Sequence, residues 1–323
     1  MGTDAARWQG KRVLVAGGTG FLGGHFARRL RQLGAEVTSC SRGEGVDLRD
    51  PLAAREAIAR ARPTVVINCA ANQGGVAYQE ECPGTILYDN TLIQLHTLDA
   101  LRQVDPTIRY VNIIPACAYP AEPRDGAYRE SELEAGPMHP SADNYGVTKR
   151  LAVLQARHYA RQYGVASTCV VLANTYGPHD HFGPTRSHVL AALLERFREA
   201  HHTGAPEVVV WGRGLAERDL LYVDDAIEGT LRVVEQCPDA GLLNIGTGRG
   251  VSVREIAETV SGVVGYTGRI TFDATRPEGP LRKILDIERL RQLLGWTPPT
   301  PLAEGVRHTL EWLETAQSEE AAA

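Results

Sequence analysis

The sequence lacks the features that define several common classes of protein. No apolar run approaches the ~18 residues that a membrane-spanning helix needs, so we expect no membrane association. The first ten residues hold no apolar signal core, and we expect a cytoplasmic protein. The 39 acidic residues outnumber the 34 basic ones, which argues against nucleic acid as a partner. No internal repeat or long low-complexity tract is present.

The cysteines form none of the common metal or redox motifs. The six are scattered along the chain, at Cys40, Cys69, Cys82, Cys117, Cys169 and Cys237. They form no C-x-x-C pair, and no His/Cys spacing suits zinc, so we expect no bound metal. Most of them are interpreted as buried small apolar side chains. Cys117 is the exception, because a resemblance described below gives it a role.

A glycine-rich turn near the N-terminus stands where a dinucleotide-binding fingerprint would. The β-branched run 11–16 leads into Gly17-Gly-Thr-Gly20-Phe21-Leu22-Gly23, and a helix pattern follows over 24–33. Gly17 permits a tight turn, Gly20 lets the backbone approach a pyrophosphate, and Gly23 lets the helix pack on the strand. The helix N-terminus adds free N–H groups and a positive dipole end. This context predicts nucleotide binding.

The end of the second expected strand, 36–40, bears on the choice of cofactor. An acidic residue there would bond the ribose 2′-hydroxyl of NAD, but the chain has none until Glu44. A hydroxyl and a guanidinium, Ser41 and Arg42, better suit the 2′-phosphate of NADP. NADP is therefore favoured, while NAD stays open because Glu44 can fold back. Asp47 and Leu48 are placed to meet the adenine edge; the alternative for 47–50 is a helix cap before Pro51.

Strands and helices alternate along the first half of the chain. Apolar runs at 63–71, 109–114 and 166–172 are expected strands, and Asn90 is expected to open a helix over 91–101. This alternation predicts an α/β fold with a Rossmann-type doubly wound, mostly parallel sheet. Ligands of such sheets lie outside the carboxyl ends of the strands. The loop after 63–71 ends there, and we assign Ala70, Ala71 and Asn72 to cofactor binding.

The composition changes after Asn174, where residues 174–188 become rich in Gly, Pro and His. We interpret this change as the start of a smaller, interleaved C-terminal substrate lobe. The predicted Rossmann domain comprises residues 1–173 plus about 219–248. The predicted lobe comprises about 174–218 plus 249–323.

The most informative stretch is Tyr145-Gly-Val-Thr-Lys149, which opens a helical run expected to end at Gly164. At i and i+4, the two side chains lie over one face of the helix. A phenol has an unperturbed pKa of about 10, and a nearby lysine cation would lower that pKa. The pair would then be a usable proton carrier. The spacing alone is also that of an ordinary amphipathic helix, and the surrounding motifs favour the catalytic reading.

These motifs together resemble a known family. The glycine turn, Tyr145-x-x-x-Lys149 and Tyr222-Val-Asp-Asp225 are similar to those of extended short-chain dehydrogenase/reductases of the nucleotide-sugar epimerase/dehydratase group. Longer runs resemble the GDP-L-fucose synthase family, at 116–120, 174–188, 208–212, 244–248, 272–279 and 282–286. The resemblance covers nearly the whole chain and is strongest from Asn174 onward.

The resemblance implies an enzyme that epimerises GDP-4-keto-6-deoxymannose at C3 and C5 and then reduces its ketone with NADPH. Epimerisation needs a base on one face of the sugar and an acid on the other. The family's cysteine and histidine fall on Cys117 and His188, with Cys117 as a thiol of lowered pKa. A packed thiol and a capping or structural imidazole are the alternatives. Hydride transfer would use Tyr145 and Lys149.

The same resemblance implies substrate contacts and an assembly. Asn174 and Val189 match diphosphate and ribose contacts, and Arg218 matches a diphosphate clamp. Lys283, with Arg282 beside it, would add charge near the sugar or phosphates, and Trp211 would stack on or wall the base pocket. Each cation is otherwise a solvated surface residue. A nucleotide-sugar, GDP-linked, is the implied ligand, and a homodimer would pair the helices near Asn90 and Tyr145 into a four-helix bundle.

One position departs from the family pattern. The family places a serine or threonine hydroxyl four residues before the loop tyrosine, and this position is Pro115, which has no hydroxyl. Losing such a donor costs about 10²–10³ in rate unless a neighbour such as Ser141 or Asn72 supplies it. An epimerase or 4-dehydrogenase without net reduction is therefore the alternative. A catalytically quiet NADP-binding regulator is a third reading, opposed by the retained catalytic residues.

Overall fold

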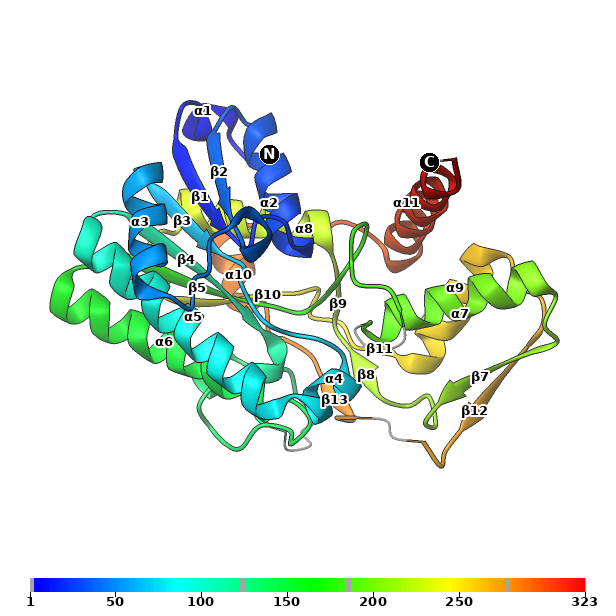
Figure 1. Cartoon of the computed structure of the whole chain (residues 1–323). Helices are drawn as coiled ribbons and strands as arrows, with labels where there is room; N and C mark the ends of the chain where they lie inside the picture. The colour runs from blue at the N-terminus through cyan, green and yellow to red at the C-terminus, as the bar shows by residue number, and fades with distance from the viewer. Residues whose placement is uncertain (1–2, 122–125, 184–186, 277–278, 323) are drawn as a thin grey trace.

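A computed structural model of the chain describes residues 3–121, 126–183, 187–276 and 279–322. Figure 1 shows a large parallel sheet between two layers of helices, with a smaller lobe beside it. Among the described residues, no helix has the length and apolar character needed to cross a membrane.

The large sheet has six strands in the order β10-β5-β4-β3-β1-β2, and every neighbouring pair is parallel. The strands are β1 (Arg12–Ala16), β2 (Glu36–Cys40), β3 (Val65–Asn68), β4 (Arg109–Pro115), β5 (Ser167–Leu172) and β10 (Leu242–Ile245). The chain runs outward from β1 to β2 and then returns to place β3 on the other side of β1. This reversal is the topological switch point of a doubly wound sheet. The predicted Rossmann-type fold is therefore confirmed.

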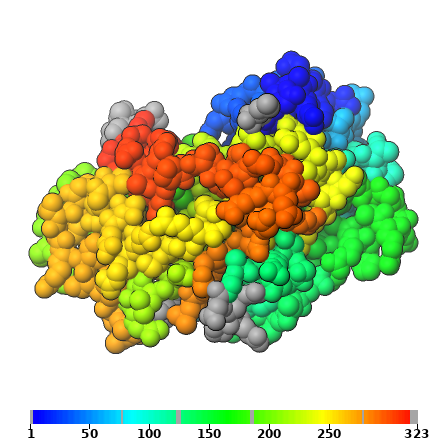
Figure 2. All heavy atoms as spheres, turned by 180° about the vertical axis from the view of Figure 1, so that it is seen from behind, coloured from blue at the N-terminus to red at the C-terminus, as the bar shows by residue number. Residues whose placement is uncertain are grey.

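Helices cover both faces of this sheet. On the face toward the viewer in Figure 1, α5 packs between α3 and α6. On the other face, which Figure 2 shows from behind, α8 packs against α2 and α10. The helices are α2 (Phe21–Gln32), α3 (Pro51–Ala61), α5 (Pro83–Val104), α6 (Asp143–Tyr163), α8 (Val223–Gln236) and α10 (Glu288–Leu294). A short α1 (Ala5–Trp8) precedes β1.

The core lies between the sheet and these two layers. A parallel sheet covered on both faces buries successive residues of its strands, so its strands are apolar without alternation. All four residues of β3 are buried, and Val66 and Ile67 are fully enclosed. On α2, Phe26 and Leu30 lie one turn apart and are both fully buried against the sheet.

The smaller lobe is built from segments that alternate with those of the large sheet. It holds α7 (Val189–Thr203), the parallel pair β7 (Glu207–Trp211) and β12 (Arg269–Asp273), α9 (Val253–Val264), and α11 (Leu302–Ala322), which packs on α9. Two small sheets join lobe and domain: β6 (Asn174–Tyr176) with β9 (Leu220–Tyr222), and β8 (Glu217–Arg218) between β11 (Val251–Ser252) and β13 (Arg282–Lys283). Helix α10 packs on β10 and α8, although the sequence assigned its range to the lobe.

The start of α5 differs from the sequence prediction. Helix α5 begins at Pro83, a favoured first helical residue, so Asn90 lies inside the helix instead of opening it. The Asn90 amide is buried and donates to the carbonyl oxygens of Asn72 and Ile86, each at 2.7 Å. Helix α6 ends as predicted, with Gly164 in the left-handed conformation at φ 72°.

Candidate active site

The glycine turn between β1 and α2 is packed as a nucleotide-binding turn requires. Gly17 has φ 75°, and a Cβ there would lie 2.8 Å from the Ala70 nitrogen of the loop after β3. A Cβ on Gly23 would lie 2.0 Å from the Gly17 oxygen, so only glycine lets α2 approach β1. Gly20 caps α2 without a side-chain bond, and a Cβ there would meet only the Gly17 oxygen, at 3.3 Å. The space beside Gly20 therefore fits a phosphate group.

The residues expected to meet the adenine have defined partners. The Asp47 carboxylate accepts from the Arg49 guanidinium at 2.5 Å, and Arg49 also reaches Asp89 at 2.9 Å. The hydrogen bond from Arg49 lowers the pKa of Asp47 to about 2. Asp50 caps α3 by accepting from the Leu52 nitrogen at 2.8 Å, so the helix-cap alternative applies to Asp50 and not to Asp47. Leu48 is buried in the core.

The end of β2 holds an acidic group beside the predicted hydroxyl. Ser39 and Ser41 both donate to the Glu44 carboxylate, the Ser41 bond measuring 2.8 Å. Glu44 has thus folded back over the strand end, as the NAD alternative requires. Arg42 begins the short 3₁₀ turn Arg42–Glu44 and is close enough to Asp47 for its charge to lower the pKa of that carboxyl.

Tyr145 and Lys149 lie on one face of α6, as the i, i+4 spacing predicts. The Lys149 ammonium is 5.6 Å from the centroid of the Tyr145 ring and donates to the Ile113 oxygen of β4 at 3.2 Å. Tyr145 is 7% exposed and Lys149 is 1% exposed. Burial lowers the pKa of Lys149 to about 8, and it raises the pKa of Tyr145 above its ordinary value. The predicted lowering of the tyrosine pKa is therefore not found, because desolvation dominates.

Cys117 lies in the turn Ala116–Ala118 that follows β4, close to Tyr145 and Lys149. Gly146 makes this approach possible, because a Cβ there would lie 3.1 Å from the Cys117 oxygen. Burial raises the pKa of the Cys117 thiol to about 11, against the expected lowering, while the charges of Lys283 and Lys149 act in the opposite direction. At neutral pH the thiol is protonated.

His188 immediately precedes α7, and it contacts the large domain. Its side chain makes no cap hydrogen bond, so it is not a helix-capping imidazole. Its Nε2 lies 3.3 Å from the amide nitrogen of Gln73, in the loop after β3. Although the ring is open to solvent on one side, surrounding protein lowers the pKa of His188, and a charge on His181 lowers it further. Gln73 was not singled out in the sequence, because 115 positions separate it from His188.

Both neighbours proposed to replace the hydroxyl missing at Pro115 have other side chains as partners. The Asn72 amide donates to the Asp89 carboxylate at 2.9 Å, and its oxygen accepts from the Tyr78 hydroxyl at 3.0 Å. The Ser141 hydroxyl is bonded to the His139 Nδ1 at 2.8 Å. Pro115 itself ends β4, opposite Leu172 of β5.

The predicted substrate residues begin where the chain enters the lobe. Asn174 opens β6 and pairs with Leu220 of β9, and Val189 is the first residue of α7. The Arg218 guanidinium donates to the backbone oxygens of Glu217 and Pro280, at 2.8 and 2.7 Å. These bonds fix the direction of its side chain.

Lys283, expected to add charge near the sugar or phosphates, is buried and has defined partners. It is 7% exposed, and its ammonium donates to the Pro120 oxygen at 3.1 Å and lies 5.1 Å from the Tyr128 ring centroid. Burial lowers its pKa to about 8. Its positive charge acts on Cys117, where it partly offsets the rise in the thiol pKa that burial causes.

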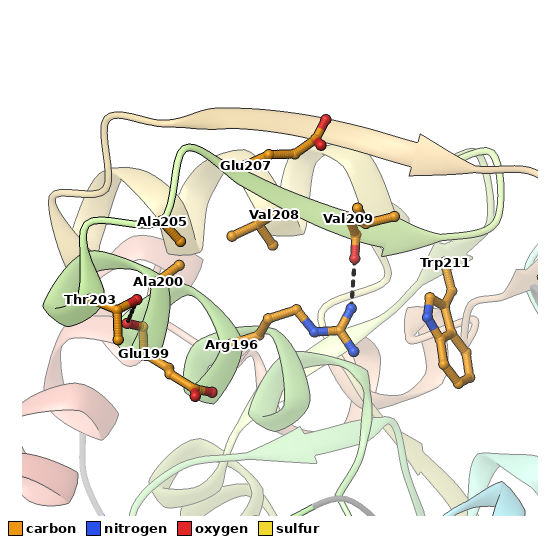
Figure 3. Close-up of a pocket in the computed structure, with 9 residues that line it drawn as sticks. All are labelled: Arg196, Glu199, Ala200, Thr203, Ala205, Glu207, Val208, Val209 and Trp211. Atoms are coloured by element: carbon orange, nitrogen blue, oxygen red, sulfur yellow. Dashed lines mark hydrogen bonds between the residues drawn. The ribbon is translucent and has the colours of Figure 1, made fainter.

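Trp211 stands at the edge of an open hollow in the lobe, which has a volume of about 430 Å³ and is drawn in Figure 3. The indole is 54% exposed, and the Arg276 guanidinium lies 5.3 Å from its ring centroid. Arg196 of α7 lies beside it and donates to the Val209 oxygen at 2.7 Å (Figure 3). Sequence reasoning missed Arg196, which has no motif around it.

Asp219, also missed in the sequence, holds the segment around Arg218 in place. Its buried carboxylate accepts from the Thr247 hydroxyl at 2.7 Å, the Thr247 nitrogen at 2.9 Å and the Leu285 nitrogen at 3.3 Å. It thereby joins the loop after β10 to the segment after β13. All six cysteines are free thiols, and the described residues contain no group of three or more His, Cys, Asp or Glu side chains able to hold a metal ion.

Comparison with known proteins establishes the class of this protein. The model of the NAD dependent epimerase/dehydratase family matches residues 13–246, and the chain belongs to that family. The chain is 36% identical over 312 residues to the GDP-L-fucose synthase of Escherichia coli, covering 94% of this chain and 96% of that protein.

Solved structures share the fold across nearly the whole chain. A GDP-L-fucose synthetase of Naegleria fowleri with NADP bound is 25% identical, with a TM-score of 0.85 and coverage of 95% of this chain and 93% of that one. A GDP-6-OMe-4-keto-L-xylo-heptose reductase of C. jejuni is 22% identical, with a TM-score of 0.87 and coverage of 98% and 100%. The second of these bears on the fold alone.

Proposed function

We propose that the protein is a nucleotide-sugar epimerase/reductase that acts on a GDP-4-keto-6-deoxyhexose, or a related sugar nucleotide, with NADP(H). The observation that carries this proposal is the grouping of Cys117, Tyr145 and Lys149 at the carboxyl edge of the sheet, with His188 reaching the same edge from the lobe. The similarity to GDP-L-fucose synthase over 94% of the chain supports it.

Cys117 and His188 are assigned to proton transfer at the sugar carbons, and Tyr145 and Lys149 to the ketone oxygen. Cys117 Sγ takes a proton from the carbon next to the ketone, and His188 returns one from the opposite side. Tyr145 Oη gives its proton to the ketone oxygen during reduction, and its raised pKa keeps the phenol protonated at neutral pH. The Lys149 ammonium stabilises the phenolate that results. When bound, the nicotinamide supplies the hydride.

Cofactor binding is assigned to the glycine turn and the end of β2. Gly17, Gly20 and Gly23 leave a backbone cradle that a Cβ would fill, which fits a pyrophosphate. Phe21 and Leu22 open α2 over it. Ser41 and Arg42 would hold the 2′-phosphate of NADP once Glu44 moves away from Ser41; with Glu44 in place, NAD is the alternative.

The nucleotide is assigned to the lobe. Arg218 would clamp the diphosphate, with Asn174 and Val189 as further contacts to the diphosphate and ribose. Trp211 and Arg196 would border the base, since they flank the hollow of Figure 3. Lys283 would act on Cys117 instead of the phosphates, because two carbonyl oxygens hold its ammonium.

A homodimer is proposed through α5 and α6. These helices pack side by side, and large apolar side chains of both remain exposed: Leu87, Tyr88, Val147 and Leu151. Pairing with a second copy would bury them in a four-helix bundle. A cytoplasmic location stays a prediction.

Epimerisation without net reduction is the second candidate. It is favoured by Pro115, since Asn72 and Ser141 are each bonded to another side chain. Such an enzyme would exchange carbon-bound protons but would consume NADPH slowly.

Incubation of the cofactor-stripped protein with GDP-4-keto-6-deoxymannose in D₂O, with and without NADPH, tests both candidates. Mass spectrometry reads deuterium at C3 and C5, and absorbance reads NADPH. Both signals together support the first proposal, and deuterium alone supports the second. Cys117→Ser should abolish the deuterium signal, whereas Tyr145→Phe should abolish only NADPH consumption. Absence of both signals in the wild type rejects this substrate.

The Cys117 pKa predicts the pH dependence of exchange. The thiolate is the base, and the thiol pKa is raised to about 11. The thiolate fraction should therefore increase about tenfold for each pH unit below that value. Proton return needs protonated His188, whose pKa is lowered, so the protonated fraction of His188 should fall about tenfold for each unit above its pKa. The two changes offset each other, and the exchange rate should be flat between about pH 7 and 9. A rate that changes about tenfold per unit in this range would contradict a Cys117 base acting with a His188 acid.

A further inference from the structure

The contact between Gln73 and His188 joins the loop after β3 to the first turn of α7. We propose that Gln73 is a positioning residue that holds neutral His188 in the tautomer with its proton on Nδ1. Its consequence for catalysis rests on the proposed function, but the tautomer is a property of the protein alone.

Two hydrogen bonds fix the orientation of the Gln73 amide. Its nitrogen donates to the Gly74 oxygen at 3.4 Å and lies 3.3 Å from Nε2 of His188. A carbonyl oxygen only accepts, so the nitrogen end of the amide must face Gly74. The second hydrogen of that nitrogen then points to His188. The Gly74 oxygen also accepts from Gln79 of α4 (Val76–Glu81) at 3.4 Å, which ties the loop to that helix.

The donor at Gln73 decides which imidazole nitrogen carries the proton. An amide N–H cannot accept, so Nε2 must present its lone pair to it. In a neutral imidazole, the single proton then lies on Nδ1. Protein packed against one side of the ring and the charge of His181 from its own segment both lower the pKa of His188 and favour this neutral form. The side chain that the loop after β3 places against His188 is Gln73, which is uncharged.

The Gln73 amide can also bond the cationic form of His188 after it rotates by half a turn. When Nε2 of His188 gains a proton from water, the amide must present its oxygen, which removes its bond to Gly74. Nε2–H is then held by Gln73, so the hydrogen free to move to the substrate carbon is the one on Nδ1. The substrate carbon gains this proton. His188 regains its resting tautomer when Nε2 loses its proton to water and Nδ1 takes one up.

The tautomer can be read directly in the full-length protein. Long-range ¹H–¹⁵N spectra of histidine-labelled protein, with His188→Asn identifying the signal, distinguish a protonated Nδ1 from a protonated Nε2. We expect Nδ1–H in the wild type. Gln73→Glu offers only acceptor oxygens, so it should move the proton to Nε2 and raise the pKa of His188 by about one unit.

Matched variants separate this role from loop packing. Gln79→Met removes the other amide bonded to Gly74 and should leave the His188 tautomer unchanged, whereas Gln73→Met should leave a mixture of tautomers. A wild-type His188 with its proton on Nε2 would overturn the proposal. So would a Gln73→Glu spectrum that matches the wild type.

Exchange of deuterium into GDP-4-keto-6-deoxymannose adds a functional measurement. The limb of the pH profile that requires protonated His188 should move upward by about one unit in Gln73→Glu and stay in place in Gln79→Met. Coincident profiles for Gln73→Glu and wild type would reject the positioning role. If the wild type exchanges no deuterium, the proposed function is at fault, and the spectra still decide the tautomer.

Discussion

The Lys149 ammonium and the Tyr145 ring are stacked one helical turn apart, 5.6 Å from nitrogen to ring centroid, and both are buried. The ammonium donates to one backbone carbonyl oxygen, that of Ile113, and otherwise lies among thiols and apolar groups. A charge in such surroundings costs free energy. The fold therefore tolerates a destabilising group at the position that we propose for proton transfer.

Replacement of Lys149 by methionine should stabilise the protein at neutral pH. The pKa of Lys149 falls from 10.5 to about 8, and one unit is worth about 1.4 kcal/mol, so the buried charge costs about 3 kcal/mol at pH 7. Lys149→Met should raise the free energy of unfolding by about 1–3 kcal/mol in urea titrations. NADPH-dependent reduction should fall at least about 100-fold, because the phenolate loses its counter-ion.

The same buried charge should make the stability of the wild type depend on pH. Between pH 8 and 10.5 the folded protein has lost the Lys149 proton while the unfolded chain still binds it, so wild-type stability should rise with pH across this window. Buried Lys283 adds a rise of the same sign. Lys11→Met is the control, because Lys11 also lies over a ring, 5.4 Å from the centroid of Trp8, but is exposed. A control that gains as much stability as Lys149→Met would refute the burial argument.

Pro115→Ser should restore the donor to the ketone oxygen. The backbone at Pro115 has φ −82° and ψ 151°, a conformation that serine adopts without strain. We expect the rate of NADPH oxidation with GDP-4-keto-6-deoxymannose to rise by about 10- to 1,000-fold, with deuterium exchange at C3 and C5 unchanged. Pro115→Ala removes the ring without adding a hydroxyl and should give no gain. Equal rates for the serine and alanine variants would mean that the hydroxyl is irrelevant.

Glu44→Gln should improve the use of NADPH. The Glu44 carboxylate is bonded to Ser41 at 2.8 Å, where it would repel a 2′-phosphate. Removing the charge should lower the KM for NADPH about tenfold while leaving the KM for NADH the same or higher. Glu36→Gln, at the opposite end of β2, is the matched control. A preference for NADH that survives the substitution would locate cofactor selection elsewhere.

Tyr88→Lys should disrupt the proposed dimer. Tyr88 is 64% exposed on α5, and burying a lysine charge in a four-helix bundle would be unfavourable. Light scattering after size-exclusion chromatography should give a dimer for the wild type and a monomer for the variant. Leu52→Lys, on exposed α3, should remain dimeric. A monomeric wild type would reject α5 and α6 as the interface.

Local patterns predicted most of the fold and the parts of the site that lie on one element. The glycine turn, the alternating strands and helices, and the shared face of Tyr145 and Lys149 depend on neighbours within a few residues. Helix and strand periods express such relationships directly. The start of α5 was missed because its first turn, from Pro83, has no apolar periodicity that marks it.

Relationships across the fold could not be read in this way. Gln73 and His188 meet because the carboxyl edge of β3 faces the lobe, and no spacing in the sequence expresses that distance. Lys283 has the composition of a phosphate contact, but its strand β13 directs it toward Tyr119 and Pro120. The raised pKa of Tyr145 follows from the depth of burial, which depends on every segment packed around α6.

The repeated passage of the chain between sheet and lobe limits how this protein can be altered. The chain leaves the large sheet after β5, returns for α8 and β10, leaves again for α9 and β12, and returns once more for α10. No single cut therefore releases the lobe as a cassette that could be exchanged for that of a relative. Changes of sugar specificity, whether by evolution or by engineering, must be made residue by residue within the short segments that border the site.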